Sequence, residues 1–283
     1  MASAIKCIRG IEKDEFLSKV AKAYMAILGD GKGGIFCEDS LKLPNEWKST
    51  TKQQIDLGKF DVLLANPPFG KDIKVKGEEK LKQFDLAYNW KKEIDAFSKT
   101  NKLKKEETIQ ILFIERSLKL LKDGGRMGIV LPETFFHAPK SRYVLHYMLK
   151  GNNVTWMLDL PHNTFRPHNN AKCVVIILEK NRPQQDEINM AVAEEIGHDH
   201  QGKEIYRWDY LKREANKKEL WDDIPLIINE FEANSFNKYC FKVKSKSAIS
   251  KNIFVPRYYW QSKIKEIENL ARKEKLELVP IKD

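Results

Sequence analysis

The pattern of apolar and polar residues divides the chain into short continuous runs and longer periodic stretches. A short continuous apolar run is typical of a buried strand, and apolar residues repeated every three or four positions are typical of a helix. The continuous runs predict strands at 5–10, 35–37, 60–65, 126–131, 154–160 and 171–178. The periodic stretches predict helices at 13–28, 109–121 and 139–149.

Predicted strands and helices alternate along the first two-thirds of the chain. Such alternation predicts an α/β fold with a mostly parallel sheet that carries helices on both faces. Only a loop separates the predicted strands at 154–160 and 171–178, so we expect this last pair to be antiparallel. The pattern therefore predicts a mostly parallel sheet with an antiparallel last strand, and no internal repeat is visible.

The chain changes character at two places. Residues 71–105 are polar and rich in lysine, which predicts a long surface insertion. Beyond residue 180 the chain is more charged and less regular, although residues 258–275 have helical spacing. We therefore predict a first domain at 1–180, followed by a basic, partly helical extension at 181–283.

The composition excludes several classes of protein and leaves the partner open. The 283 residues are 42% hydrophobic and 32% charged, which excludes collagen-like, mucin-like and wholly disordered chains. The formal net charge is +10, which suits a polyanionic partner. Solvated surface lysines explain the same excess equally well.

The cysteines and the apolar runs indicate the compartment. Four cysteines are scattered without a C-x-x-C pair, which argues against a disulfide framework or a zinc ribbon and favours a reducing cytosol. No apolar run is long enough to span a bilayer, and the N-terminus lacks a secretory signal pattern. We expect a cytoplasmic protein with no membrane partner.

The strongest chemical signal is Asn66-Pro67-Pro68-Phe69, which directly follows the predicted strand at 60–65. Two prolines form a rigid turn that would fix the Asn66 side chain and the Pro67 carbonyl in one direction. Two such acceptors can bind both hydrogens of an exocyclic amino group. The Phe69 ring could stack on a flipped base. The alternative is a proline-rich turn in which Asn66 acts only as a local cap.

This motif resembles the adenine-binding motif of the gamma-order adenine N6 DNA methyltransferases, and most closely that of the modification subunits of type I restriction-modification systems. The resemblance covers roughly residues 5–180, in blocks that follow the family's order. It implies a Rossmann-like methyltransferase fold that uses S-adenosylmethionine. It also implies that Asn66, Pro67, Pro68 and Phe69 bind the target adenine.

Two acidic residues match the cofactor-binding blocks of the same family. Gly10-Ile11-Glu12 resembles the block whose carboxylate binds the cofactor ribose, which assigns this role to Glu12. Glu38-Asp39-Ser40-Leu41 resembles the block in which an aspartate contacts the cofactor adenine, which assigns this role to Asp39. Taken alone, Glu12 could be an acid at the start of a helix and Asp39 a helix N-cap.

One block of the family pattern is missing. The glycine-rich loop that follows the family's first strand should lie before Glu12, and no matching loop occurs there or downstream. The glycine-rich segment at 29–34 precedes a predicted strand instead of following one. We therefore expect a sheet that lacks its first central strand. We also expect the chain to be a piece of a longer enzyme, folded but catalytically impaired alone.

The resemblance implies methyl transfer to the N6 of adenine in DNA. The implied partners are double-stranded DNA, a specificity subunit or fused recognition domain, and a restriction subunit. Methyl transfer needs no metal, and His198-Asp199-His200 is typical of a polar loop. Two alternatives remain: a methyltransferase acting on guanine in RNA or on glutamine in protein, and a non-catalytic DNA-binding scaffold.

Overall fold

The computed structural model of the chain describes residues 7–29, 33–70, 72–94, 96–209, 214–261, 267 and 270–274. Parts of the strand predicted at 5–10 and of the helix predicted at 258–275 lie outside these residues. The chain forms two compact units. The first comprises 1–129, 146–152 and 179–182, and the second comprises 130–145, 153–178 and 183–283. The domain boundary predicted at residue 180 stays a prediction.

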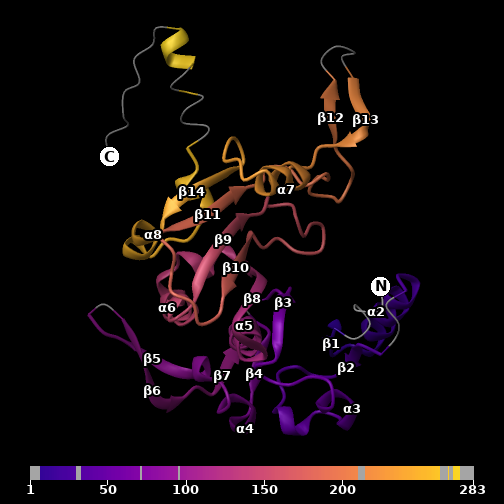
Figure 1. Ribbon diagram of the computed structural model, residues 1–283, viewed down its shortest axis with the longest axis vertical. Coiled ribbons are helices and arrows are strands. Elements are labelled where there is room, and N and C mark those ends of the chain that lie inside the picture. Colours follow the sequence, from indigo (N-terminus) through magenta and orange to yellow (C-terminus); the bar gives the residue numbers. More distant parts are fainter. Residues whose placement is uncertain are drawn as a thin grey trace. The chain divides into compact units, whose positions relative to one another are not determined.

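The largest sheet has six strands in the order β14-β11-β9-β10-β8-β3 (Figure 1). Its strands are β3 (Phe60–Ala65), β8 (Leu121–Pro132), β9 (Asn153–Asp159), β10 (Cys173–Glu179), β11 (Glu187–Val192) and β14 (Cys240–Lys244). β3 is parallel to β8 and β9 is parallel to β11, whereas β14 is antiparallel to β11. The sheet is therefore mixed.

The strand β10 runs antiparallel to both of its neighbours. At one end of β8 the Gly124 amide donates to Lys180, and at the other the Glu133 amide donates to Lys172. The end of β9 meets the start of β10, because the Leu160 amide donates to the Cys173 carbonyl over 3.1 Å. The predicted α/β class and the antiparallel last pair are confirmed.

The first unit contains further elements, some of which line the site described below. They are β1 (Gly10–Glu12), α2 (Glu15–Ile27), β2 (Ile35–Cys37), η1 (Pro44–Glu46), α3 (Ser49–Lys52), β4 (Lys74–Lys76), α4 (Glu78–Leu81), η2 (Asp85–Ala87), β5 (Tyr88–Lys92), β6 (Phe97–Leu103), β7 (Glu106–Thr108) and α5 (Ile109–Leu120). The helix α6 (Arg142–Leu149) has residues in both units. The predicted helices thus correspond to α2, α5 and α6.

The second unit also contains residues beyond 180 that continue the sheet. They add β11 and β14, the hairpin of β12 (Tyr206–Asp209) and β13 (Glu214–Leu220), and the helices α7 (Ile224–Glu232), α8 (Ser245–Lys251) and α9 (Pro256–Tyr259). The short helices η3 (Glu133–Phe136) and η4 (Pro139–Ser141) precede them in this unit. Among the described residues, no helix has the length and apolar character needed to span a bilayer.

A buried ion-pair node fixes α9 to the strand β9. The Asp159 side chain is fully buried and binds both Lys172 and Arg257, the latter at 3.2 Å. Arg257 also donates to the Ala193 carbonyl over 3.1 Å. Because a buried carboxylate is costly without partners, these contacts tie the segment after α8 to the sheet.

The first strand begins later than the sequence predicted. β1 starts at Gly10, which the pattern placed at a turn, and Gly10 pairs with Ile35 of the parallel strand β2. A Cβ at Gly10 would lie 2.8 Å from the Ile35 Cδ1. The glycine therefore leaves room for the Ile35 side chain of the neighbouring strand.

The strand β3 lies at the edge of the six-stranded sheet, as expected of a sheet that lacks a neighbouring strand (Figure 1). Val62 and Leu64 on this strand are 51% and 83% exposed. β1 and β2 form a separate two-stranded sheet. The apolar residues that predicted α2 are largely exposed as well, including Phe16 and Ile27.

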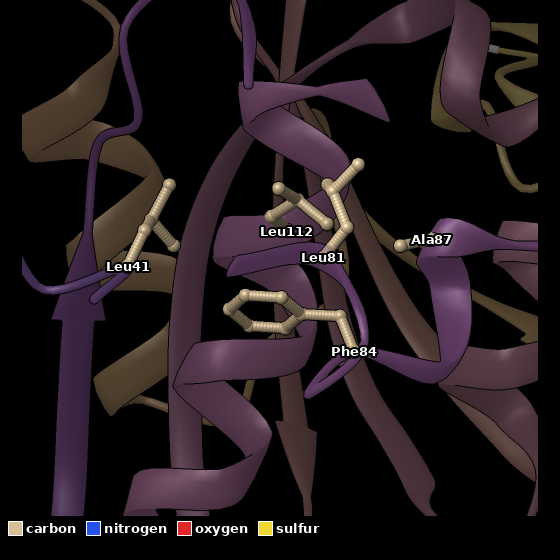
Figure 2. Close-up of a cluster of buried hydrophobic side chains, with 5 residues drawn as sticks. All are labelled: Leu41, Leu81, Phe84, Ala87 and Leu112. Atoms are coloured by element: carbon tan, nitrogen blue, oxygen red, sulfur yellow. The ribbon is translucent and has the colours of Figure 1, made fainter. Parts of the chain in front are cut away.

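The segment predicted as a long surface insertion is folded, and a few of its residues belong to a buried hydrophobic cluster. Figure 2 shows Phe84, Leu81 and Leu112 gathered together, with Leu41 on one side and Ala87 on the other. Phe84 and Leu112 have no exposed surface. The lysines of the segment dominate its composition, whereas a small number of apolar residues pack it against α5.

We expect Phe84→Ala to lower the free energy of unfolding by about 3–5 kcal/mol, because it would leave a cavity in this buried cluster. Urea unfolding followed by circular dichroism measures the change. The matched control is Ile94→Ala in the same insertion, where the side chain is 95% exposed. We expect the control to change stability by less than about 0.5 kcal/mol. Equal effects of the two substitutions would contradict a buried anchor.

Candidate functional site

A pocket of about 690 Å³ lies within the first unit, where several strands end. The ends of β1 and β3 and the loop after β2 contribute to its wall. The carboxyl ends of parallel strands are the usual place for ligands in open α/β sheets. The residues predicted for the site that line this pocket are Glu12, Asp39, Asn66, Pro67 and Pro68. Phe69 is half-buried next to the turn and is not among the lining residues.

The Asn-Pro-Pro turn is held by a residue that the sequence did not single out. Pro67 is buried, whereas Asn66 and Pro68 are exposed. Gln110 on α5 is only 4% exposed, and its Nε2 donates to the Pro68 carbonyl over 3.0 Å. The prolines restrict the backbone and Gln110 fixes its direction, so the turn is constrained from two sides.

Asn66 presents its amide group at the surface of the pocket. Within the part of the chain that the structure describes, the Asn66 side chain forms no hydrogen bond. Its oxygen is therefore available as an acceptor, next to the carbonyl group of Pro67. Such a pair of acceptors is suited to a planar group with two N–H donors.

Glu12 ends β1 and lies before the helix rather than at its cap. Asp14 caps α2, because its side chain accepts the Leu17 amide over 2.8 Å. One Glu12 oxygen accepts the Asp14 amide over 2.8 Å. Among the described residues, the other oxygen accepts no hydrogen bond. The Glu12 carboxylate is thus oriented at the pocket and retains an acceptor for a ligand.

Asp39 lies in the loop after β2, where no helix begins between residues 38 and 43. Its Oδ1 accepts the Leu41 amide over 3.0 Å, and its Oδ2 lies 3.3 Å from the Lys13 Nζ. The first contact is a turn of the kind aspartate favours. Asp39 therefore shapes its own loop and also offers a carboxylate to the pocket.

Glu38 supports this loop and was not predicted as a site residue. The side chain is 4% exposed, and its two oxygens accept the amides of Asp39 and Lys48. Burial raises the pKa of Glu38, but these amide donors and the charge of Lys42 lower it by more, so the net shift of its pKa is downward. The charged carboxylate therefore holds both ends of the loop that carries Asp39.

Arg116 on α5 also lines the pocket and was not predicted. Its guanidinium donates to the Lys42 carbonyl over 3.0 Å and to the Gln83 side chain. It lies 5.6 Å from the Trp47 ring centroid and 5.1 Å from that of Phe84. Burial lowers the pKa of Arg116 to about 10, so the group remains charged at neutral pH. A buried arginine is not visible in a sequence pattern, because its burial depends on these tertiary partners.

The lysines of the insertion have specific partners. Lys99 pairs with Asp85 and Lys74 pairs with Glu106, and Lys74 also lines the pocket. Lys71 lies outside the described residues.

The polar loop at His198-Asp199-His200 forms a turn of its own. Asp199 accepts the amides of Gln201 and Lys203, over 2.8 and 3.0 Å. No group of three or more His, Cys, Asp or Glu residues suited to a metal ion occurs within the described ranges.

Comparison with known sequences gives a consistent result. The sequence profile of the N-6 DNA methylase family matches residues 3–267. RM.Eco57I of Escherichia coli, a type II restriction enzyme and methyltransferase, is 24% identical over 124 residues, covering 43% of this chain and 11% of that protein. RM.MjaORFECS2P of Methanocaldococcus jannaschii is 25% identical over 150 residues, covering 53% of this chain and 11% of that protein.

Comparison with solved structures supports the fold. The methyltransferase subunit of a type I restriction-modification system from Streptococcus thermophilus superimposes with a TM-score of 0.61 at 19% identity, covering 89% of this chain and 48% of that chain. A type I modification subunit from Vibrio vulnificus gives a TM-score of 0.55 at 18% identity, covering 85% of this chain and 44% of that chain. At these identities the likeness shows a shared α/β fold.

The chain spans about half the length of these two structures and about a tenth of the two curated relatives. The family profile nevertheless matches the strands β1, β2 and β3 together with the pocket that they line. The chain belongs to the N-6 DNA methylase family.

Proposed function

We propose that this chain carries the adenine-binding and cofactor-binding residues of a DNA methyltransferase that acts on the N6 of adenine. The observation that carries the proposal is the shared pocket. The Asn66-Pro67-Pro68 turn and the carboxylates of Glu12 and Asp39 line one cavity of about 690 Å³. The acceptors of the turn suit an amino group, and the carboxylates suit a molecule with hydroxyl and amino groups.

The Asn66 side chain and the Pro67 carbonyl would accept the two hydrogens of the adenine amino group. These contacts orient the nitrogen lone pair toward the methyl donor and favour its attack. Attack of N6 on the methyl carbon would form the new N–C bond as the bond between that carbon and sulfur breaks, and the amino nitrogen would then release one proton to water. Phe69, adjacent to the turn, is assigned to stack on the flipped base. Catalysis then depends mainly on position and orientation.

The residues present fit S-adenosylmethionine, which supplies the methyl group on a positively charged sulfur. Glu12 retains a carboxylate oxygen that can accept from ribose hydroxyls, and Asp39 offers a carboxylate for the adenine amino group. Ile11, Leu41 and Ile55 add apolar wall to the same pocket. Carboxylates and apolar side chains in one cavity match the mixed character of the cofactor.

The partners follow from the same proposal. Type I restriction-modification subunits are among the structures that share this fold. We therefore include double-stranded DNA as the substrate, and a specificity subunit or fused recognition domain and a restriction subunit as partners. The basic charge of +10 supports a polyanionic substrate.

Calorimetric titration of this chain with S-adenosylmethionine tests the cofactor site. We expect Glu12→Gln and Asp39→Asn each to weaken binding about tenfold, since each removes a charge-assisted hydrogen bond. The matched control is Asp56→Asn, an exposed aspartate. Unchanged binding in both pocket variants would count against the assignment.

In an intact enzyme that contains this chain, we expect Asn66→Ala to abolish methyl transfer and to leave the affinity for S-adenosylmethionine within about twofold, because Asn66 would contact only the target base. Transfer from radiolabelled cofactor to unmethylated plasmid DNA, with N6-methyladenine identified by mass spectrometry, measures the activity. Asn101→Ala, at an exposed asparagine of β6, is the control. Equal loss of binding and activity would show that Asn66 is structural.

The same assay distinguishes the alternative substrates. RNA and protein are offered in parallel with DNA. Label on guanine or glutamine would replace the DNA assignment. Cofactor binding without transfer to any of the three would favour a non-catalytic scaffold.

Gln110 is proposed as a positioning residue, because it acts through the Pro68 carbonyl. Gln110→Glu keeps the shape but removes the N–H donor, at a cost of about 1–3 kcal/mol for the buried acceptor that loses its partner. We expect kcat to fall at least tenfold with little change in the KM for cofactor. Gln54→Glu, at an exposed glutamine, is the control. A rise in the cofactor KM with kcat unchanged would contradict this role.

A further inference from the structure

The segment at 233–265 has an unusual charge pattern. It contains seven lysines and one arginine and no aspartate or glutamate. The described part of this segment forms β14, α8 and α9 in the second unit. Positive charge is therefore concentrated in one stretch of the fold, and it is not balanced locally along the chain.

A second cavity, of about 390 Å³, lies along this segment. Lys238, Lys242 and Lys244 line it together with Tyr259 and Trp260. We call these five residues the basic groove. β14 is the outermost strand of the six-stranded sheet (Figure 1), so the groove follows a sheet edge that no further strand of that sheet covers.

The aromatic wall of the basic groove is fixed by hydrogen bonds. The Trp260 Nε1 donates to the Lys238 carbonyl over 3.2 Å, which joins the segment after α9 to the start of β14. The Tyr259 hydroxyl donates to the Ile253 carbonyl over 3.0 Å. Both rings are therefore held in place before any ligand binds.

The lysines of the basic groove are exposed, and few acidic side chains lie near them. Lys242 and Lys244 lie 3.7 and 2.8 Å from the same carboxylate, that of Glu187. The Lys238 ammonium lies over the Tyr239 ring. Glu230 faces the start of β14, where its carboxylate accepts backbone amides from residues 238–240. Exposed ion pairs contribute little, so a phosphate can replace Glu187 as a partner.

We propose that the basic groove binds the sugar–phosphate backbone of DNA, with Lys238, Lys242 and Lys244 on phosphates and an aromatic ring against a sugar or base. This inference rests on the proposed function, which makes DNA the substrate. Alternate residues on one side of a strand lie about 7 Å apart, so Lys242 and Lys244 form a row along β14. A row of lysines beside fixed aromatic rings is a common arrangement for binding a nucleic-acid strand.

The test is equilibrium binding of a fluorescent DNA duplex by anisotropy, over about 50–200 mM salt. The variant combines Lys238→Gln, Lys242→Gln and Lys244→Gln. We expect at least a tenfold loss of affinity and a slope of log K against log salt that is smaller by about two to three. The control combines Lys19→Gln, Lys59→Gln and Lys150→Gln, three exposed lysines of the first unit, and removes the same charge.

The outcomes are separable. Equal affinities and slopes for the two triple variants would overturn the groove and leave the proposed methyl transfer untouched. DNA binding that depends on the groove, in an intact enzyme that contains this chain but transfers no methyl group, would support the groove and count against the proposed function. If polyglutamate bound the groove more tightly than the duplex, the site would belong to an acidic protein, and the DNA assignment would be overturned.

Discussion

Three of the buried polar side chains on the helix α5 bind the loops around the site. Gln110 donates to the Pro68 carbonyl, Glu115 accepts the amides of Asp85 and Leu86, and Arg116 donates to the Lys42 carbonyl. An unsatisfied polar group at these positions would be costly, so the helix selects the loops that can supply partners. The site thus depends on one helix that holds the Asn-Pro-Pro turn, the insertion and the Asp39 loop.

This arrangement explains how exposed, chemically useful groups can be well oriented. Asn66 and Glu12 lie at strand ends, where the sheet offers few neighbours to restrain them. The restraint acts two residues further along the chain: Gln110 binds the Pro68 carbonyl after Asn66, and the Asp14 amide binds one Glu12 oxygen. Asn66 and Glu12 are thus oriented by contacts that leave at least one of their oxygen acceptors available to a ligand.

The strand β3 has an unpaired edge, because it is the last strand of the six-stranded sheet. Leu64 and Val62 are exposed there, and the backbone groups on that side have no strand to pair with in this sheet. An exposed apolar edge strand normally invites pairing with another chain. In this protein the same edge borders the pocket, because Val62 and Leu64 also line it. The unpaired edge of β3 therefore forms part of the pocket wall.

The sequence alone determined the strands at β2 and β3, the helices α2 and α5, and the positions of Glu12, Asp39 and Asn66 at strand ends. These follow from apolar periodicity and from turn-forming residues, which act over a few neighbouring positions. Only the tertiary structure decided that Gln110, Glu38 and Arg116 support the site and that the lysine-rich insertion is anchored through Phe84. A polar side chain, or one aromatic residue in a polar segment, is buried by partners that lie far away in the sequence. The local pattern of residues does not indicate which partners these are.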